Sequence, residues 1–357
     1  MTTTESPALD EGRLMAFLGT FVQDLGATVA AGSVVLGDQL GLYRSLLQGP
    51  AGSAEIARRT GTDARYVTEW ARGQAAGGYI TYDAGSDTYS LSTEQAFALT
   101  DPDGAVFLPG AFQLALGALA ARPRIADAFR TGAGVGWHEQ GQGVFIGCER
   151  FFRPGYLANL VPSWIPALEG VEDKLRTGAK VADIGCGHGA SSVLLAQAYP
   201  ASTVAGSDYH AGSIDEARKR AADAGVTERI SFEVASAQTF SGTGYDLVAT
   251  FDCLHDMGDP LGAARHVREA VVADGTWLIV EPFAGDEVTD NMNPVGRVYY
   301  SFSTLLCVPN AKSQPGGHAL GAQAGEAAIR AVVSEAGFTR FRRAAETPFN
   351  IVYEARP

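Results

Sequence analysis

From residue 179 to the end of the chain, short apolar runs alternate with stretches whose apolar residues recur at helical spacing. The apolar runs have the length of buried strands and occupy residues 180–185, 202–208, 230–236, 245–252 and 276–283. Strands that alternate with helices predict a doubly wound, parallel α/β sheet. Residues 338–357 predict two further strands, paired as a hairpin across Glu346–Asn350, which would place an antiparallel strand in this sheet.

The first long apolar segment, residues 13–48, contains few charges. Leu14, Leu18, Val22 and Leu25 recur in it at helical spacing. A helix that is apolar around most of its surface must be buried on several sides. We expect a second subunit to bury it, so the segment predicts a homodimer. An ordinary pair of core helices is the alternative.

Residues 53–92 have the pattern of a helix-turn-helix followed by a hairpin, which is typical of a winged helix. The turn ends on Asp63, a good N-cap for the second helix, and that helix ends before Gly77. DNA binding requires a basic surface. Residues 1–100 contain six arginines, no lysine and eleven acidic residues. We therefore expect this element to serve dimerisation and scaffolding.

An aromatic-rich segment, residues 100–178, connects the two halves of the chain. It has helical patterns and holds Trp137, His138, Phe152 and Tyr156 among other aromatic residues. Pockets favour domain boundaries and aromatic walls. The connector is therefore predicted to contribute to a ligand pocket.

The length of 357 residues suits two domains of roughly 100–200 residues each. The predicted order is a mostly helical winged-helix domain (1–99), the connector (100–178), and an α/β domain (179–357) with an insert at 284–322. The net charge of −13 and the pI near 4.9 make nucleic acid and membrane surfaces poor partners.

The remaining composition bounds location and cofactor class. No apolar stretch of about 18 residues is recognised, so no membrane span is predicted. The N-terminus lacks a basic region followed by an apolar run, which predicts no signal peptide and a cytoplasmic protein. Four scattered cysteines without a CxxC pair predict neither a disulfide framework nor a zinc site, and no other metal site is expected.

The clearest chemical motif is Asp183-Ile-Gly185-Cys-Gly187-His-Gly189, between the first strand of the α/β domain and a helix. Glycines let the chain turn sharply and let a ligand approach the backbone, and the first amides of a helix favour electron-rich groups. The second strand ends at Asp208, whose carboxylate can accept hydrogen bonds from ribose hydroxyls. A dinucleotide fold is the nearest rival, but the glycine spacing, the preceding Asp183 and the C-terminal strand pair argue against it.

With these features, residues 180–357 resemble the class I S-adenosylmethionine (SAM)-dependent methyltransferases, whose sheet is Rossmann-like. The resemblance implies SAM as cofactor and S-adenosylhomocysteine (SAH) as product, with Asp208 at the ribose. The implied cofactor-binding residues are Asp183, Gly185, Gly187, Gly189, Asp208, Tyr209, Ser236, Ala237, Phe251 and Asp252. Ser236 stands where this family often has an aspartate.

A second motif, residues 254–260 (LHDMGDP), follows the fourth strand, at the end of the sheet where ligands bind. It resembles the L-H-D-W-x-D motif of small-molecule O-methyltransferases with a winged-helix dimerisation domain, with Met257 in place of Trp. The long insert and the closing residues look like an actinobacterial subgroup often regarded as regulators. The resemblance implies that His255 is the general base.

The implied chemistry suits a histidine. A phenol has a pKa near 10 and an imidazole about 6.5, so a mostly neutral His255 could accept the acceptor's proton. Such a base needs an orienting partner. Glu281, at the end of the fifth strand, matches a family glutamate that supports the histidine, and Asp256 is the alternative.

The methyl acceptor is expected to bind between the connector and the insert, since long loops are usually functional. The candidate substrate-binding residues are Trp137, His138, Phe152, Tyr156, His210, Asn291, Tyr299 and Tyr300. An uncharged, aromatic lining would favour a flat or apolar small molecule.

The sequence thus predicts a homodimeric SAM-dependent methyltransferase acting on a small molecule, with a hydroxyl as the favoured acceptor. Two alternatives stay open. One is methylation at nitrogen or carbon, or a non-methylating enzyme of secondary metabolism on the same fold. The other is a SAM-sensing winged-helix transcription regulator, which the acidic charge of residues 1–100 disfavours.

Overall fold

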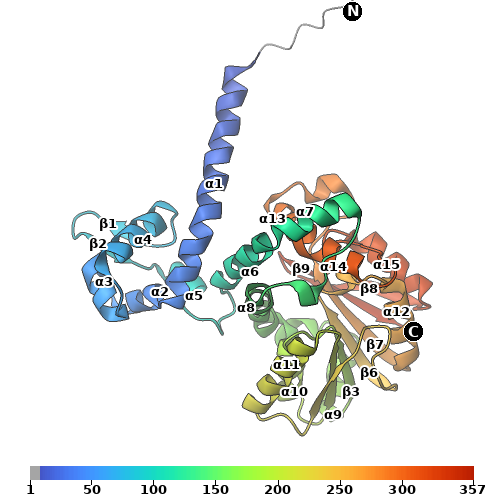
Figure 1. Cartoon of the computed structure of the whole chain (residues 1–357). Helices are drawn as coiled ribbons and strands as arrows, with labels where there is room; N and C mark the ends of the chain where they lie inside the picture. Colours follow the sequence, from blue (N-terminus) through green and yellow to red (C-terminus); the bar gives the residue numbers. More distant parts are fainter. Residues whose placement is uncertain (1–8) are drawn as a thin grey trace, which may run out of the picture. The chain divides into compact units, whose positions relative to one another are not determined.

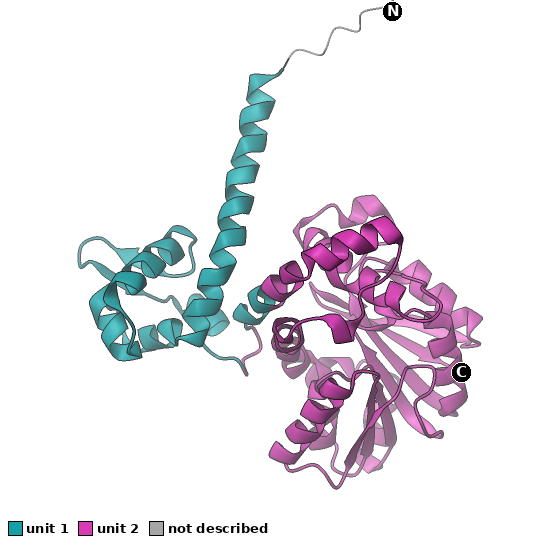
Figure 2. Cartoon of the chain, in the orientation of Figure 1, with its two compact units in different colours: residues 1–102, 107–113 teal, residues 103–106, 114–357 magenta. Residues whose placement is uncertain are grey.

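The computed structural model describes residues 9–357; the prediction of no signal peptide rests partly on residues 1–8, which lie outside the described residues. The chain divides into two compact units (Figure 2). Unit 1 comprises residues 1–102 and 107–113, and unit 2 comprises residues 103–106 and 114–357.

Unit 1 begins with one long helix, α1 (Glu11–Gln39; Figure 1). Asp10 caps it by accepting a hydrogen bond from the backbone N–H of Arg13 (3.0 Å). The buried residues of α1 lie from Ala31 onward. The large apolar side chains before that point are exposed: Leu14, Met15, Phe17, Leu18, Phe21, Val22, Leu25 and Val29. The expected helix therefore forms, but unit 1 covers only its last turns.

Helix α1 also corrects one expectation. We expected no apolar stretch of membrane-spanning length, yet an 18-residue window of α1 is long and apolar enough to cross a membrane. It is the one such helix within residues 9–357, and 6% of that window is buried. Length and composition do not distinguish a membrane span from a helix that packs against protein.

The rest of unit 1 confirms the winged-helix prediction. Asp63 caps α4 by accepting hydrogen bonds from the backbone N–H groups of Arg65 (2.9 Å) and Tyr66 (3.2 Å). Trp70, a residue of α4, packs against Tyr43 in the core of the unit. The elements are α2 (Leu42–Ser45), η1 (Leu46–Gln48), α3 (Ser53–Thr60), α4 (Ala64–Ala76), the antiparallel strands β1 (Thr81–Asp83) and β2 (Thr88–Ser90), and α5 (Thr93–Leu99).

Unit 2 is built on a seven-stranded sheet in the order β5-β4-β3-β6-β7-β9-β8 (Figure 1). The strands are β3 (Lys180–Ile184), β4 (Thr203–Asp208), β5 (Ile230–Val234), β6 (Tyr245–Phe251), β7 (Val271–Pro282), β8 (Arg340–Glu346) and β9 (Asn350–Arg356). The first five are parallel, and β9 pairs antiparallel with both β7 and β8. The predicted sheet with its terminal hairpin is confirmed, although β7 begins at Val271 rather than at residue 276.

Helices cover both faces of this sheet because successive strand residues point to opposite sides. Val181 joins a core with Leu195 of α10, whereas Ala182 joins the opposite core with Val267 of α12. Nearly continuous burial along β3 and β6 is typical of parallel strands covered on both faces. The covering helices are α9 (Val171–Thr177), α10 (Ala190–Ala198), α11 (Ala211–Asp223), α12 (Pro260–Ala270) and α15 (Gly325–Glu335).

The insert is largely helical, where the sequence analysis expected a long loop. Asn293 caps α13 by accepting a hydrogen bond from the backbone N–H of Gly296 (2.9 Å), and Pro294 takes the first helical position. The insert contains η5 (Val288–Asn291), α13 (Pro294–Phe302), the π-helical turn η6 (Ser303–Cys307) and α14 (Val308–Ser313). The preceding helices of the connector are α6 (Pro109–Ala120), α7 (Arg122–Thr131), η2 (Trp137–Glu139), α8 (Gln142–Asn159) and η3 (Leu160–Trp164).

Candidate active site

The glycine motif forms a tight turn between β3 and α10. Gly185, Gly187 and Gly189 have φ values of 72°, 51° and 73°, a region that other residues rarely adopt. A Cβ atom on Gly185 would lie 2.8 Å from the Cys253 sulfur. The Gly185 N–H donates to the Ser207 carbonyl of the neighbouring strand (2.8 Å). The turn therefore needs glycine both for its conformation and for close packing.

Asp183 braces this turn from inside the protein. Its Oδ2 accepts hydrogen bonds from the hydroxyls of Ser191 (2.6 Å) and Ser192 (2.5 Å) in the first turn of α10. Its Oδ1 is buried without a hydrogen-bond partner. Burial raises the pKa of Asp183 to about 6, against the effect of the two serine hydrogen bonds. Asp183 thus fixes the turn to the helix and does not line the cavity described next.

Asp208 stands at the end of β4, as the sequence analysis expected. Its Oδ2 accepts from the Gly187 N–H (3.0 Å) and its Oδ1 from the His210 N–H (2.8 Å). Burial raises the pKa of Asp208 although both hydrogen bonds act to lower it. Each carboxylate oxygen can accept a second hydrogen bond. Asp208 can therefore hold the glycine turn and a pair of ligand hydroxyls at once.

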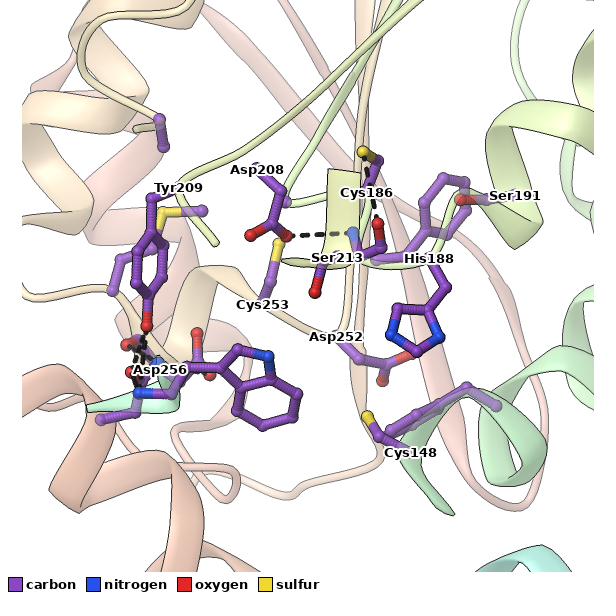
Figure 3. Close-up of a pocket in the computed structure, with 18 of the residues that line it drawn as sticks. Cys148, Cys186, His188, Ser191, Asp208, Tyr209, Ser213, Asp252, Cys253 and Asp256 are labelled. Atoms are coloured by element: carbon purple, nitrogen blue, oxygen red, sulfur yellow. Dashed lines mark hydrogen bonds between the residues drawn. The ribbon is translucent and has the colours of Figure 1, made fainter. Parts of the chain in front are cut away.

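A cavity lies over the carboxyl ends of β3, β4, β5 and β6, where sheets of this topology bind ligands (Figure 3). Its walls come from the glycine turn, the ends of the strands, helix α8 and the α14 region. The predicted residues that line it are Trp137, Phe152, Tyr156, Gly185, Gly187, Asp208, Tyr209, Ser236, Ala237, Phe251 and Asp252.

Several predicted substrate residues lie outside these walls and hold neighbouring segments in place. His210 caps α11 through Ser213 and packs its ring against Phe145 (centroids 4.8 Å apart). Asn291 donates to the Gly285 carbonyl (3.0 Å) at the start of the insert. The predicted substrate residues His138, Tyr299 and the partly exposed Tyr300 also lie outside the walls. The Tyr299 hydroxyl donates to the Phe349 carbonyl (2.7 Å). The predicted cofactor residue Gly189 lies outside them too.

Two insert residues that line the cavity, Asn310 and Gln314 of the α14 region, were not predicted from the sequence. Asn310 Oδ1 accepts hydrogen bonds from the Tyr209 hydroxyl (2.8 Å) and the Trp137 N–H (3.0 Å). Its Nδ2 donates to Asp256 Oδ2 (3.1 Å). One amide thus ties together the connector, the end of β4 and the segment after β6. Cys148 and Glu149 of α8 were also missed as lining residues.

His255 and Glu281 form a buried pair beside the cavity. His255 lies in η4 (Leu254–Asp256), directly after β6, and its Nδ1 is 2.5 Å from Glu281 Oε2 on the neighbouring strand β7. The other oxygen, Glu281 Oε1, accepts from the Leu254 N–H (2.9 Å). The two side chains are only 5% and 4% exposed. The predicted histidine and its predicted orienting carboxylate are therefore in direct contact, although neither lines the cavity itself.

The surroundings of His255 act on its protonation in opposite directions. Burial lowers the pKa of His255, but the Glu281 carboxylate and a hydrogen bond with the Cys307 side chain raise it more, so that it lies well above 6.5. The Glu281 carboxylate therefore favours the protonated imidazole. Accepting a proton requires the neutral form, which becomes available as the pH rises.

Two further carboxylates, Asp252 and Asp256, lie on the cavity wall (Figure 3). Asp252 has a φ of 52° and accepts hydrogen bonds from the Tyr156 hydroxyl (3.1 Å) and Asn350 Nδ2 (2.8 Å). Burial raises the pKa of Asp252 to about 7 and that of Asp256 to about 6. The wall is therefore acidic, which differs from the uncharged lining expected from the sequence.

These residues fit a nucleoside cofactor that carries positive charge. The glycine turn leaves backbone free to approach a ligand, Asp208 can accept from ribose hydroxyls, and buried carboxylates favour a cation. Within residues 9–357, no group of three or more His, Cys, Asp or Glu side chains is arranged to hold a metal ion.

Two segments of the chain match known protein families. Residues 175–321 match the family described as Methyltransferase domain, and residues 28–101 match the family described as Rv2258c-like winged HTH domain. The first match contains the glycine turn, Asp208 and the His255–Glu281 pair. The second contains the helix-turn-helix and the hairpin of unit 1.

Individual proteins are similar to this chain in sequence or in fold. The 27-O-demethylrifamycin SV methyltransferase of Amycolatopsis mediterranei is 30% identical over 131 residues, 34% of this chain and 48% of that relative, so the match spans about half the relative's length. Human N-acetylserotonin methyltransferase in complex with SAM has a TM-score of 0.70 and 15% identity, over 100% of this chain and 99% of that one. An O-methyltransferase family protein from Burkholderia thailandensis has a TM-score of 0.67 and 18% identity, over 98% and 99%. At these identities the structures show that the fold is shared.

Proposed function

We propose that the chain is a SAM-dependent methyltransferase with an N-terminal winged helix-turn-helix domain, and that it transfers a methyl group from SAM to a hydroxyl of a small molecule. The observation that carries this proposal is the His255–Glu281 pair, with 2.5 Å between Nδ1 and Oε2, at the end of the sheet that faces the cavity. A buried carboxylate on one ring nitrogen orients the imidazole for proton exchange with an acceptor.

The proposed cofactor site follows the cavity wall. When bound, SAM supplies an electrophilic methyl group on its sulfonium. We assign its ribose to Asp208 with Tyr209, its methionine part to the turn at Gly185 and Gly187, and its adenine to the segment around Ser236. The remaining assigned residues are Ala237, Phe251 and Asp252 on the wall, and Asp183 and Gly189 behind it.

Proton removal is the task assigned to His255. A neutral phenol or alcohol is a poor nucleophile, and a positioned base contributes typically 10²–10⁴-fold. In our proposal the acceptor's proton passes to the imidazole while Glu281 keeps Nδ1 protonated and oriented. The resulting imidazolium is stabilised by the Glu281 carboxylate, which the raised pKa of His255 reflects.

The acceptor is assigned to the side of the cavity lined by Trp137, Phe152 and Tyr156. Phe152 and Tyr156 are stacked (centroids 6.3 Å apart), which gives this wall a flat aromatic surface. Residues that hold the surrounding segments, His210, Asn291 and Tyr299 among them, act in this proposal by fixing the shape of the pocket rather than by touching the acceptor.

We also propose that the active form is a homodimer in which a second copy covers α1. Residues Phe17 and Phe21 are 70% and 51% exposed on a helix that unit 1 leaves uncovered over most of its length. Burying apolar surface stabilises by about 25 cal/mol per Å². Pairing of this helix with a second copy would remove that surface from water.

The test is methyl transfer from labelled SAM to a panel of phenols, catechols and amines, with SAM binding measured in parallel. His255→Ala should bind SAM as the wild type does and lose about 10²–10⁴-fold in kcat. A control substitution, His266→Ala, changes a histidine whose Nε2 contacts the Phe240 carbonyl behind the cavity. Equal turnover in wild type and His255→Ala would refute the base assignment, and a wild type that binds no SAM would refute the proposed function.

A further inference from the structure

The cavity has an unbalanced charge. Its walls contain the carboxylates of Glu149, Asp208, Asp252 and Asp256, and no lysine or arginine among residues 9–357 lines it. All four are half-buried, so a ligand that fills the cavity removes the remaining water around them. A carboxylate that loses this water is stabilised by a partner of opposite charge, either in the protein or in the ligands.

Two of the four carboxylates have partners in the protein. Glu149 forms an ion pair with Arg220 (2.8 Å). Asp208 accepts from two backbone N–H groups and is the assigned partner of ribose hydroxyls. The nearby charge of Glu281 is matched by His255. These groups need no further cation.

Asp252 and Asp256 remain without a cationic partner of their own. Asp252 receives hydrogen bonds from the neutral groups of Tyr156 and Asn350, and Asp256 receives one from the neutral amide of Asn310. The charges that act on both are Glu281 and the already paired His255. Their raised pKa values, about 7 and about 6, fit carboxylates that lack a cation.

Aromatic rings share the wall with these two carboxylates. Tyr156 is hydrogen-bonded to Asp252, and the backbone N–H of Trp137 is joined to Asp256 through Asn310. Both aromatic residues line the cavity. Aromatic faces attract organic cations through their ring quadrupole. A wall of rings and carboxylates is thus suited to a molecule with an aromatic body and a positive charge.

We propose that the methyl acceptor is an organic cation, a small aromatic molecule that carries a protonated amine besides the group that is methylated. Asp256 holds its charge, with Asp252 on the same cavity wall, and Trp137 and Tyr156 contact its ring. SAM has a single net positive charge, and two carboxylates await partners, so one remains for the acceptor. This inference rests on the proposed function and specifies its substrate class.

The test compares pairs of compounds that differ in one charge. Tyramine is paired with 4-ethylphenol, dopamine with 4-ethylcatechol, and serotonin with 3-ethyl-5-hydroxyindole, and binding to SAH-loaded enzyme is measured by calorimetry. Hydrogen bonds to charged groups suggest that the amine should bind about 10-fold to 100-fold tighter in at least one pair. Asp256→Asn, which keeps an acceptor for Asn310, should abolish that preference, and Asp252→Asn should weaken it.

Asp223→Asn is the matched control, because it removes one charge from an exposed position at the end of α11. It should leave the amine preference unchanged. Circular dichroism and thermal unfolding check that all three variants fold.

Three results would overturn the inference. One is equal or tighter binding of the neutral member, or absence of amine binding, in every pair. Another is a preference that survives both Asp256→Asn and Asp252→Asn. The third is that these variants lose only the tighter binding of SAM relative to SAH. That result would assign the two carboxylates to the sulfonium of SAM. The first of these results, together with methylation of neutral phenols and intact SAM binding, would leave the proposed function standing while removing this substrate class.

Discussion

Apolar side chains are usually buried in a protein and charged side chains are usually exposed. Helix α1 and the carboxyl end of the sheet in unit 2 depart from this rule in opposite ways. Along α1, large apolar side chains such as Phe17 and Met15 are exposed, 70% and 66% respectively. Beside the cavity, Glu281 and His255 are almost completely buried, and Asp252 is held between two hydrogen-bond donors. Charged residues are rarely buried unless paired, and large exposed apolar patches commonly mark interaction sites.

The two regions differ in the kind of partner that each one lacks. Apolar surface on α1 calls for an apolar partner, since burial stabilises it, and we propose that this partner is a second copy of the chain. Carboxylates in the cavity call for ligands with positive charge, since the described residues give Asp252 and Asp256 no cationic partner of their own. The first region predicts assembly and the second predicts chemistry. Perturbing each one separately therefore tests whether they are independent.

The largest effect is expected from Glu281→Gln at the buried end. Removing this carboxylate lowers the pKa of His255, because the Glu281 charge is what raises it above 6.5. The pH profile of kcat/KM rises as the imidazole loses its proton, so its acid limb should move to lower pH in the variant. Losing the orienting partner should reduce kcat about 10–100-fold on the alkaline plateau.

The exposed Glu269→Gln on α12 is the control and should reproduce the wild-type profile. Both profiles are measured as initial rates with labelled SAM between about pH 5.5 and about pH 9.5. This interval covers the range in which a histidine with a raised pKa titrates. An acid limb that does not move would mean that Glu281 does not set the protonation of the base.

A smaller effect, on assembly alone, is expected from the double substitution Phe17→Glu with Phe21→Glu. Truncation or reversal of central apolar anchors typically costs at least about 2 kcal/mol, so the dimer dissociation constant should rise about 30-fold or more. Sedimentation equilibrium measures it, and SAM affinity should stay unchanged. Gln23→Glu, an exposed polar position on the same helix, is the control.

Two results would contradict this assignment of α1. A wild type that is monomeric at all measured concentrations would leave the helix without its proposed partner. Co-sedimentation of the wild type, but not of the double variant, with phosphatidylcholine vesicles would assign the apolar surface to a membrane, for which α1 has the length.

The smallest effect is expected in the pH dependence of thermal stability without ligands. Asp252 and Asp256 have folded pKa values of about 7 and about 6, above the 3.8 of an unperturbed aspartate. The folded state therefore holds more protons than the unfolded state between these values, and stability falls as the pH rises from about 4 to about 7. His255, with its raised pKa, adds a loss above 6.5 in the same direction.

Calorimetric scans from pH 5 to 8 should show Tm falling by a few degrees, since roughly 1 kcal/mol corresponds to 2–4 °C for a unit of this size. Asp256→Asn should flatten the part of this dependence below about pH 7, because an amide does not titrate. A variant slope equal to that of the wild type would contradict the assignment of the loss to the cavity carboxylate.

The sequence predicts best where local signals and tertiary packing agree. The strands of unit 2 and the terminal hairpin were predictable because buried parallel strands form short apolar runs between helices. The winged helix was predictable because Asp63 is a strong N-cap and its turn chemistry is local. The contact between His255 and Glu281 followed from a resemblance together with the adjacency of their strands.

Other parts depend on packing that no local signal specifies. Asn310 reaches the cavity only because the insert folds back as α14, and its place in the sequence gives no hint of Tyr209 or Asp256 as partners. Asp183 lies in the recognised motif, yet the serines of α10 draw it behind the turn rather than onto the wall. The charge of the cavity likewise could not be predicted, because its four carboxylates come from separate segments that only the fold brings together.

Strand β8 closes the sheet on one side and offers an unpaired edge among the described residues. It carries Arg340, Arg342 and Arg343, which are engaged by Glu169, Glu354 and Glu346. Long charged side chains on an outer strand oppose the addition of a foreign strand. Fibrillar aggregation through this edge is thereby disfavoured, even at the high concentrations that would bring two copies of α1 together.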